Sequence, residues 1–171
     1  IPLETVVMAY NVADAAFTRM TPWEAAATPP AAPAPGLACR LYEGTFARLP
    51  DFAALTAPRA SVEPVVGLPA GAPTEHFALT MEGWLRAPAD GMYTFSLRTD
   101  DGSALDLDGR PLIDADGLHG EGDARAEVAL RAGWHPLAVR YFQAGYDAAL
   151  KLWWEGPGFA WEPVPAAALA H

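Results

Sequence analysis

The sequence predicts an all-β fold, an antiparallel β-sandwich or jelly roll, for most of its 171 residues. From residue 37 onward, apolar and polar residues alternate with a period of two in many short runs, which is typical of half-buried strands. Turn sequences such as Ala-Asp-Gly and Asp-Asp-Gly separate these runs at short intervals. The 17 prolines and 15 glycines argue against long helices. These features together favour a sandwich of short strands.

The first 36 residues differ in composition from the rest of the chain. Residues 1–20 hold two strand-like runs, TVVMAY and AAFTRM, which are too short to fold alone. Residues 21–36, TPWEAAATPPAAPAPG, contain five prolines among alanines, a composition typical of an extended, semi-rigid linker. We therefore expect a module boundary near Gly36. A start without Met or a basic flank suggests a fragment of a longer protein.

The predicted elements follow in order from residue 37. One helical turn is expected at 51–55, inside a surface loop over 49–73, and the C-terminal residues 159–171 are expected to pack Phe159 or Trp161 on the sandwich before fraying. The predicted strands lie within 37–46, 75–88, 91–99, 103–109, 110–114, 125–133, 135–143 and 149–156. Their expected inward residues include Phe77, Leu79, Met81, Tyr93, Phe95, Leu97, Leu105, Leu107, Val128, Leu130, Leu137, Val139, Leu150, Leu152 and Trp154.

Composition excludes several classes of function. A formal charge of −10 repels nucleic acid and anionic membrane surfaces, whereas cations and neutral ligands remain plausible partners. The single Cys39 rules out an intramolecular disulfide and a cysteine zinc cluster, and its apolar neighbours indicate a buried strand thiol. No apolar run reaches the roughly 18 residues of a spanning helix, so no membrane insertion is expected.

The sequence contains no strong catalytic motif. It has neither G-x-S-x-G nor a phosphate-binding loop. Paired carboxylates are the machinery of glycoside hydrolysis, but here the carboxylates lie in turns without an apolar pocket that would raise the pKa of one of them. We therefore expect a protein that is not itself an enzyme.

The adjacent pair Asp100 and Asp101 is the main candidate for a binding site. Two neighbouring carboxylates repel each other and need either a cation or full solvation, although Asp-Asp-Gly is also a good turn sequence. Ca²⁺ requires about six to eight oxygen ligands, so a second loop has to contribute. The segment QAGYD, from Gln143 to Asp147, offers an amide, a carboxylate and free carbonyls. Tyr146 in this loop and His119 are further candidates for contact with a ligand.

The remaining acidic, histidine and tryptophan residues have simpler interpretations. Turns and solvated faces account for Asp106, Asp108, Asp114 and Asp116, and neither His76 nor His135 has a predicted partner. Trp84, Trp134, Trp153 and Trp154 are expected to pack in or beside strands. Because side chains alternate along a strand, one of the adjacent Trp153 and Trp154 must face outward, where an aromatic ring suits the apolar face of a sugar.

Three blocks carry a resemblance to a known family. LYEGTFARLPDF, then GWLRAPADGMYTFSLRTDDGSALDLDGRPLIDADGLHG, then VALRAGWHPLAVRYFQAGYDAALKLWWEGPG occur in that order within residues 37–158. Together they resemble the PA14 domain, a β-sandwich found in bacterial glycosidases, adhesins and toxins and in yeast adhesins. Residues 1–20 resemble the end of a fibronectin-like or chitobiase C-terminal-type segment of bacterial glycoside hydrolases such as hexosaminidases.

The PA14 resemblance implies carbohydrate binding. In its lectin branch two consecutive aspartates joined by a cis peptide hold Ca²⁺, which in turn coordinates sugar hydroxyls. Those aspartates correspond to Asp100 and Asp101, and QAGYD occupies the place of the loop that completes the site. The implied metal ligands are Asp100, Asp101, Gln143 and Asp147, and Tyr146 and His119 join them in the predicted ligand-binding set.

Our interpretation is a non-catalytic, calcium-dependent carbohydrate-binding module of a larger secreted glycoside hydrolase or surface protein. Its expected partners are a glycan or cell-wall polysaccharide and other domains of the parent protein, in a secreted, periplasmic or cell-surface location. One alternative is an accessory β-sandwich that packs on a catalytic domain and binds no ligand. A second is a part of a glycosidase active unit, such as that of a hexosaminidase.

Overall fold

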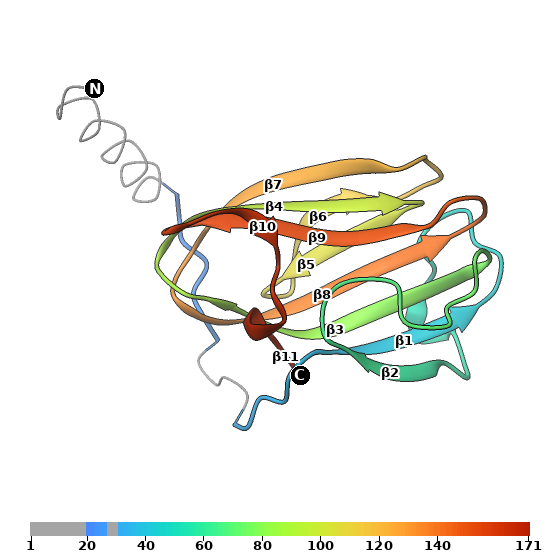
Figure 1. Ribbon diagram of the computed structural model, residues 1–171, viewed down its shortest axis with the longest axis horizontal. Helices are drawn as coiled ribbons and strands as arrows, with labels where there is room; N and C mark the ends of the chain where they lie inside the picture. The colour runs from blue at the N-terminus through green and yellow to red at the C-terminus, as the bar shows by residue number, and fades with distance from the viewer. Residues whose placement is uncertain (1–19, 27–30) are drawn as a thin grey trace.

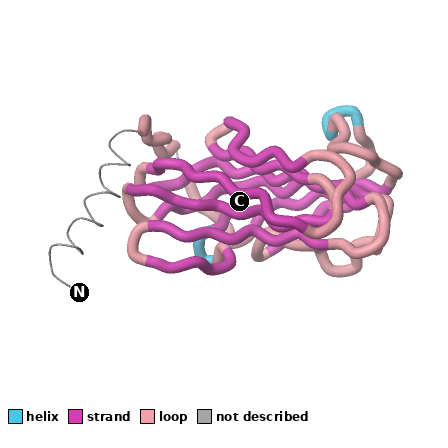
Figure 2. The backbone as a smooth tube through the Cα atoms, turned by 90° about the horizontal axis from the view of Figure 1, so that it is seen from above, coloured by secondary structure: helices cyan, strands magenta, loops and turns pink. Residues whose placement is uncertain are grey.

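Two antiparallel sheets pack face to face in the computed structural model, which describes residues 20–26 and 31–171 (Figure 1). The larger sheet has the order β2-β1-β3-β8-β5-β6, with β11 also paired to β3, and the smaller has the order β10-β9-β4-β7. Figure 2 shows the two layers from above. The strands are β1 (Leu37–Glu43), β2 (Arg59–Glu63), β3 (Phe77–Ala87), β4 (Gly91–Asp100), β5 (Ser103–Leu107), β6 (Arg110–Ala115), β7 (Gly122–Leu130), β8 (Gly133–Gln143), β9 (Ala149–Gly156), β10 (Phe159–Pro163) and β11 (Leu169–Ala170). The predicted all-β sandwich is confirmed.

The core lies between the sheets and consists of the inward residues that the alternation predicts. Phe77, Leu79 and Met81 of β3 are fully buried, and so are the alternate residues Tyr93, Phe95 and Leu97 of β4. Each such side chain contributes roughly 1.5–3 kcal/mol when it leaves water. Trp154 packs 4.8 Å from Phe159, centroid to centroid, and 5.8 Å from Tyr93. Burial of apolar area therefore holds the smaller sheet against the larger.

Two short elements lie in the segment that the sequence predicts to be a surface loop. The expected helical turn is present as η1 (Phe52–Ala54), where the Asp51 carboxylate accepts a hydrogen bond from the Ala53 N–H at 3.1 Å. β2 was not expected, because its residues are exposed or half-buried and show no strong alternation. It forms an edge of the larger sheet by pairing with β1. The helical elements of the described residues are η1 and a second short 3-10 helix, η2 (Ala166–Ala168). Neither is long enough to span a membrane.

The C-terminal residues do not fray, contrary to the sequence prediction. Phe159 packs on the core as expected, but the chain then continues through β10 and η2 to β11, where Leu169 is 2% exposed. β11 lies along β3 beside Gly83, where a Cβ atom would stand 2.2 Å from the Ala170 carbonyl oxygen. The absence of a side chain at Gly83 therefore lets the last strand approach the sheet.

The described parts of the proline-rich segment 21–36 contact the sandwich. The backbone N–H of Trp23 donates to the Ala129 carbonyl at 2.8 Å. Ala34 and His171 exchange backbone hydrogen bonds at 2.9 and 3.1 Å. The segment was predicted as an extended spacer, and these contacts tie both of its described ends to β-strand residues or to the C-terminus. The fibronectin-like remnant predicted for residues 1–20 lies, except for Met20, outside the described residues.

His135 and Asp108 form a buried ion pair that sequence reasoning missed. His135 is fully buried, and its Nδ1 lies 2.8 Å from Asp108 Oδ2 while its Nε2 lies 2.8 Å from the Arg131 carbonyl oxygen. Both partners accept hydrogen bonds, so the charged imidazolium, which donates from both nitrogens, fits this setting. Desolvation lowers the pKa of His135, but the Asp108 carboxylate and the Arg131 carbonyl outweigh it, and the pKa is raised overall.

Because of this ion pair, we expect the free energy of unfolding to depend on pH. Because the folded pKa of His135 lies above its unfolded value of about 6.5, the pair stabilises the fold below that value and the stabilisation is lost as pH rises through the folded pKa. We expect Asp108→Asn to destabilise the protein by about 1–3 kcal/mol and to flatten this decline. Urea unfolding between about pH 6 and pH 9 measures both effects.

Asp106→Asn is the matched control, because Asp106 pairs with Arg140 at 2.8 Å and not with a histidine. It should leave the pH dependence unchanged. An unaltered decline in Asp108→Asn would show that His135 does not carry it.

Candidate functional site

The Asp100–Asp101 turn and the Gln143–Asp147 loop meet at one end of the sandwich. β4 belongs to the smaller sheet and β5 to the larger, so the chain crosses between sheets at Asp100–Ser103. The chain crosses back between β8 and β9, and the registers Asp100↔Ala149 and Ser103↔Tyr141 set the two crossings side by side. They lie at the right-hand end in Figure 1. The strand topology thus brings together the two loops that were expected to form the site.

Gln143 joins the two crossings through its fully buried carboxamide. Its Oε1 accepts hydrogen bonds from the Asp101 N–H at 3.1 Å and the Tyr141 hydroxyl at 2.7 Å. Its Nε2 donates to the carbonyls of Gly145 at 2.8 Å and Asp147 at 2.9 Å. Because an amide oxygen has two lone pairs, both are used. Gln143 was expected to be a metal ligand, and in this structure its four hydrogen bonds hold the shape of the loop.

Asp101 is held in place by backbone donors from two different loops. Only 7% of the residue is exposed, and its Oδ1 accepts the His119 N–H at 3.2 Å while its Oδ2 accepts the Ala144 N–H at 2.9 Å. Each carboxylate oxygen keeps further lone-pair capacity, since a carboxylate has about four acceptor positions. The Asp100–Asp101 peptide is cis, and the Tyr141 hydroxyl shares its single proton between the Asp100 carbonyl and Gln143 Oε1.

The site accumulates negative charge. Desolvation raises the pKa of Asp100, and the nearby carboxylates of Asp101 and, more weakly, Asp147 raise it further, whereas the Glu121 N–H and His119 act in the opposite direction. Within residues 20–26 and 31–171, no Lys, Arg or His forms an ion pair with any of these three aspartates. The described chain therefore supplies no cationic side chain to balance this negative charge.

The acidic side chains do not form a ready-made cluster of ligands. In the described part of the chain, no three His, Cys, Asp or Glu side chains converge closely enough to hold a metal ion by themselves. A cation here needs backbone carbonyls or a ligand's oxygens in addition to Asp100 and Asp101, which matches the mixed oxygen ligands of Ca²⁺.

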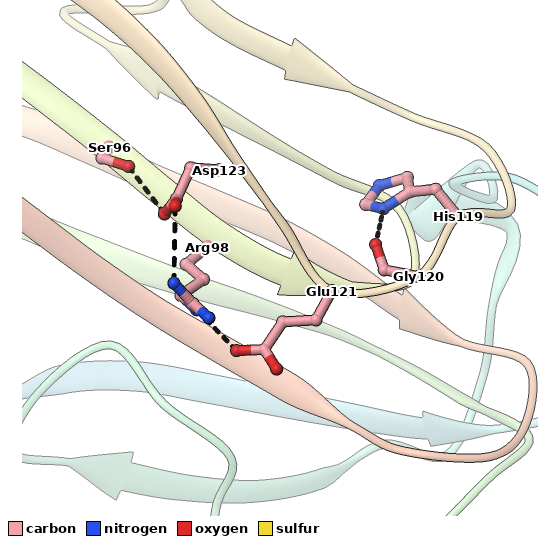
Figure 3. Close-up of polar contacts among 6 residues, drawn as sticks. All are labelled: Ser96, Arg98, His119, Gly120, Glu121 and Asp123. Carbon is pink, nitrogen blue, oxygen red and sulfur yellow. Dashed lines mark hydrogen bonds and ion pairs between the residues drawn. The ribbon is translucent and has the colours of Figure 1, made fainter.

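His119 contributes its backbone rather than its ring. The ring Nδ1 lies 2.9 Å from the Gly120 carbonyl oxygen (Figure 3), and Nε2 lies 3.1 Å from the Ala115 carbonyl oxygen. The imidazole therefore contacts backbone carbonyls of its own loop, and the hydrogen bond from His119 to Asp101 comes from the backbone N–H. The expected contact of the His119 side chain with a ligand is not supported by this geometry.

A pocket of about 540 Å³ opens beside Asp101. Its walls include Leu118 and Tyr146, which are 62% and 98% exposed. Tyr146 has a φ of 66°, and the loop that carries it is held by the two hydrogen bonds from Gln143. Tyr146 also borders a second pocket of about 340 Å³ together with Leu68 and Asp147. An exposed aromatic ring thus stands between two hollows next to the carboxylates.

Sequence reasoning missed three lining residues of the larger pocket. Glu75, His76 and Leu118 lie in turns, where no periodic pattern marks a residue as part of a site. Leu118 offered one signal, a large apolar residue among aspartates and glycines. Its 62% exposure shows that it does not serve the core.

The other aspartates of this region divide into two pairs. As predicted, Asp114 and Asp116 stabilise turns, where Asp114 accepts the Asp116 N–H at 3.1 Å and Asp116 accepts the Gly117 N–H at 2.8 Å. Asp106 and Asp108 were also assigned to turns and solvated faces. Asp108 does lie in the turn between β5 and β6, but its carboxylate also pairs with His135, and Asp106 on β5 pairs with Arg140.

Comparison with known proteins places these features in a family. The sequence model of the PA14 domain matches residues 34–166. The chain belongs to the PA14 family. This match begins and ends outside the 37–158 expected from sequence. None of the curated proteins matches the chain significantly.

Solved structures share the PA14 fold. An anti-sigma factor domain-containing protein from Clostridium clariflavum is 25% identical, with a TM-score of 0.65, and the alignment covers 87% of this chain and 52% of that one. The chain thus spans about half the length of that protein. The PA14 sugar-binding domain from an RTX adhesin is 18% identical, with a TM-score of 0.67 and coverage of 80% and 98%. The Epithelial Adhesin 9 A domain from Candida glabrata, in complex with Galb1-3GlcNAc, is 13% identical, with a TM-score of 0.66 and coverage of 88% and 95%.

Gly102 provides a test of how the site is assembled. A Cβ atom at Gly102 would stand 2.4 Å from Phe142 Cε1 and 2.7 Å from the backbone N and O of Gly117. Gly102→Ala should therefore push the 116–120 loop away from the carboxylates and destabilise the protein by about 1–3 kcal/mol. Thermal unfolding measures the loss.

Gly120→Ala is the control, because a Cβ atom there meets nothing within 4 Å. Its effect should stay within about 0.5 kcal/mol. Equal stability of the two variants would contradict the close packing of Gly102 against Gly117.

Proposed function

We propose that this PA14 domain is a calcium-dependent carbohydrate-binding module. The observation that carries the proposal is the pairing of two features: carboxylates without a charge partner in the described chain, and an open pocket beside them with an exposed aromatic wall. A cation and a polar ligand with a flat apolar face satisfy both features at once. A sugar is such a ligand.

Asp100 and Asp101 are the proposed metal ligands, with backbone carbonyls and Asp147 as further oxygen donors. Asp101 is pre-organised, since the Ala144 and His119 N–H groups fix its carboxylate before any ion arrives. The ion would coordinate vicinal hydroxyl groups of the sugar. Gln143 is not among the proposed ligands, because its amide oxygen already accepts two hydrogen bonds.

Tyr146 is the proposed stacking surface for the sugar ring. Pyranose rings present C–H faces that pack on an aromatic π-system, and 98% exposure leaves the Tyr146 ring free to receive one. The adhesin domains with the same fold include one described as sugar-binding and one in complex with a galactoside. They support a glycan as the class of ligand without identifying the sugar.

We infer that the module works outside the cytoplasm as one part of a larger secreted or surface protein, where other domains of that protein and a glycan or cell-wall polysaccharide are its partners. A glycoside hydrolase is the parent that the sequence suggested. The adhesin domains with the same fold bind sugars, which supports binding as the proposed role of the module.

A glycan array probed with and without chelator tests this function. In millimolar calcium we expect binding to a subset of glycans, and chelator should abolish it. Asp101→Asn removes a charge that the ion requires, so it should also abolish binding. Asp90→Asn is the matched control, because Asp90 lies at the other end of β4 and pairs with Arg131 at 2.9 Å.

The other outcomes distinguish the alternatives. Glycan binding that survives chelator would overturn the calcium requirement. An absence of binding by protein that is folded and saturated with calcium would favour the accessory β-sandwich. Release of free sugar from a glycan by this chain alone would favour a glycosidase unit.

A further inference from the structure

The outward face of the smaller sheet carries a second set of polar and aromatic residues, which begins next to the Asp100–Asp101 turn. Arg98 of β4 is opposite Asp123 of β7 and Lys151 of β9. One step along the strands, Ser96 is opposite Arg125 and Trp153 in the same way. Figure 3 shows Ser96, Arg98 and Asp123 in contact on this face. Strand alternation directs all six side chains away from the core.

Two tryptophans build one wall on this face. Trp153 and Trp161 of β10 stack at 6.3 Å between centroids with an interplanar angle of 17°. The Arg125 guanidinium lies 4.9 Å from the centroid of the Trp161 ring. Ser96 is fully buried beneath these groups although it points outward. The rings are therefore ordered by their neighbours, while Trp161 remains 36% exposed.

The positive charges on this face are only partly neutralised. Arg98 pairs with Glu121 at 2.5 Å and with Asp123 at 3.4 Å. Neither Lys151 nor Arg125 forms an ion pair with a carboxylate of the described residues. Like charges directly opposite each other on a sheet are destabilising, and Arg98 and Lys151 are such a pair. In a chain of net charge −10, this local surplus of cations calls for an acidic ligand.

These groups surround a pocket of about 260 Å³ lined by Arg98, Glu121, Asp123, Arg125, Lys151, Trp153 and Trp161, which we call the outer-sheet pocket. We propose that the outer-sheet pocket is a second, calcium-independent carbohydrate site that takes a pyranose carrying a carboxylate, as in a uronic acid residue. The C–H face of the ring packs on the tryptophan wall. Its carboxylate binds Lys151 and Arg125, and its hydroxyls donate to Glu121 and Asp123.

The geometry favours a sugar acid over the simpler alternatives. A plain anion would use the cations but not the aromatic wall, and a neutral sugar would use the wall but leave Lys151 without a counter-ion. The volume is slightly below the range of about 300–1,000 Å³ typical of drug-sized ligand sites. The outer-sheet pocket thus suits one ring of a chain whose neighbouring residues extend along the open sheet face.

NMR titration of the isotope-labelled chain tests the proposal, with sodium glucuronate, glucose and acetate as probes at constant ionic strength. Chelator is present throughout, because the backbone of Glu121 also contacts Asp100 of the calcium site. We expect glucuronate to shift the indole N–H signals of Trp153 and Trp161 in a saturable way, at concentrations where glucose and acetate do not.

Two variants probe the charge and the wall separately. Lys151→Met should weaken glucuronate binding about tenfold or more, and Trp161→Ala about three- to tenfold. Arg110→Met is the matched control, because Arg110 also lies over a tryptophan, 5.1 Å from the centroid of Trp23, but outside the outer-sheet pocket. Well-dispersed spectra confirm that each variant is folded.

Three results would overturn the proposal. Equal binding of acetate would make the pocket a simple anion site, and equal binding of glucose would remove the role of the carboxylate. No saturable shift with any probe would show that the outer-sheet pocket binds no sugar. Each result leaves the calcium-dependent function untouched, since the experiment contains no free calcium.

Discussion

The carboxamide of Gln143 is the constraint on which the rest of the site depends. Its four hydrogen bonds reach Asp101, Tyr141 and the two carbonyls that bracket Tyr146. The amide is fully buried, so these protein groups take the place of the water that would otherwise bind it. Leaving one of its polar atoms without a hydrogen bond would cost about 1–3 kcal/mol. The side chain thereby couples the crossing from β4 to β5 with the crossing from β8 to β9.

This arrangement separates the task of shaping the site from the task of binding. Backbone N–H groups and Gln143 position Asp101, whereas no lysine or arginine of the described chain neutralises it. Desolvation and, after it, the charge of Asp101 raise the pKa of Asp100, so this end of the sandwich has a surplus of negative charge. In the proposed function a cation relieves that surplus, and the exposed Tyr146 offers a surface to the ligand that the cation coordinates. The outer-sheet pocket has the opposite balance, since there Lys151 and Arg125 form no ion pair with a carboxylate of the described residues.

Strand alternation allowed much of the fold to be predicted. The inward positions of β3 and β4 could be read from their apolar spacing, and the placement of Trp154 inside and Trp153 outside follows from the same rule. The exposed edge strand β2 could not be read this way, because an edge with little burial has no apolar period. β11 depends on the space beside Gly83, which only the folded sheet defines.

The site could be located from sequence but its division of labour could not. The resemblance pointed to Asp100 and Asp101, and topology brings the QAGYD loop to them. Whether Gln143 binds a metal or its neighbours depends on the directions of its lone pairs, which residue type does not reveal. His135 and Asp108 illustrate the same limit, since 27 positions separate two residues that meet through the pairing of β5 with β8.

Calorimetric titration of the wild-type chain with Ca²⁺ tests the central claim most directly. We expect saturable binding of one ion per chain at about pH 7 and progressively weaker binding as the pH is lowered, because protons compete for the carboxylate of Asp100, whose pKa is raised. Gln143→Leu should weaken binding although it removes no metal ligand, because the loop loses its anchor. Absence of saturable heat with folded protein would contradict the account.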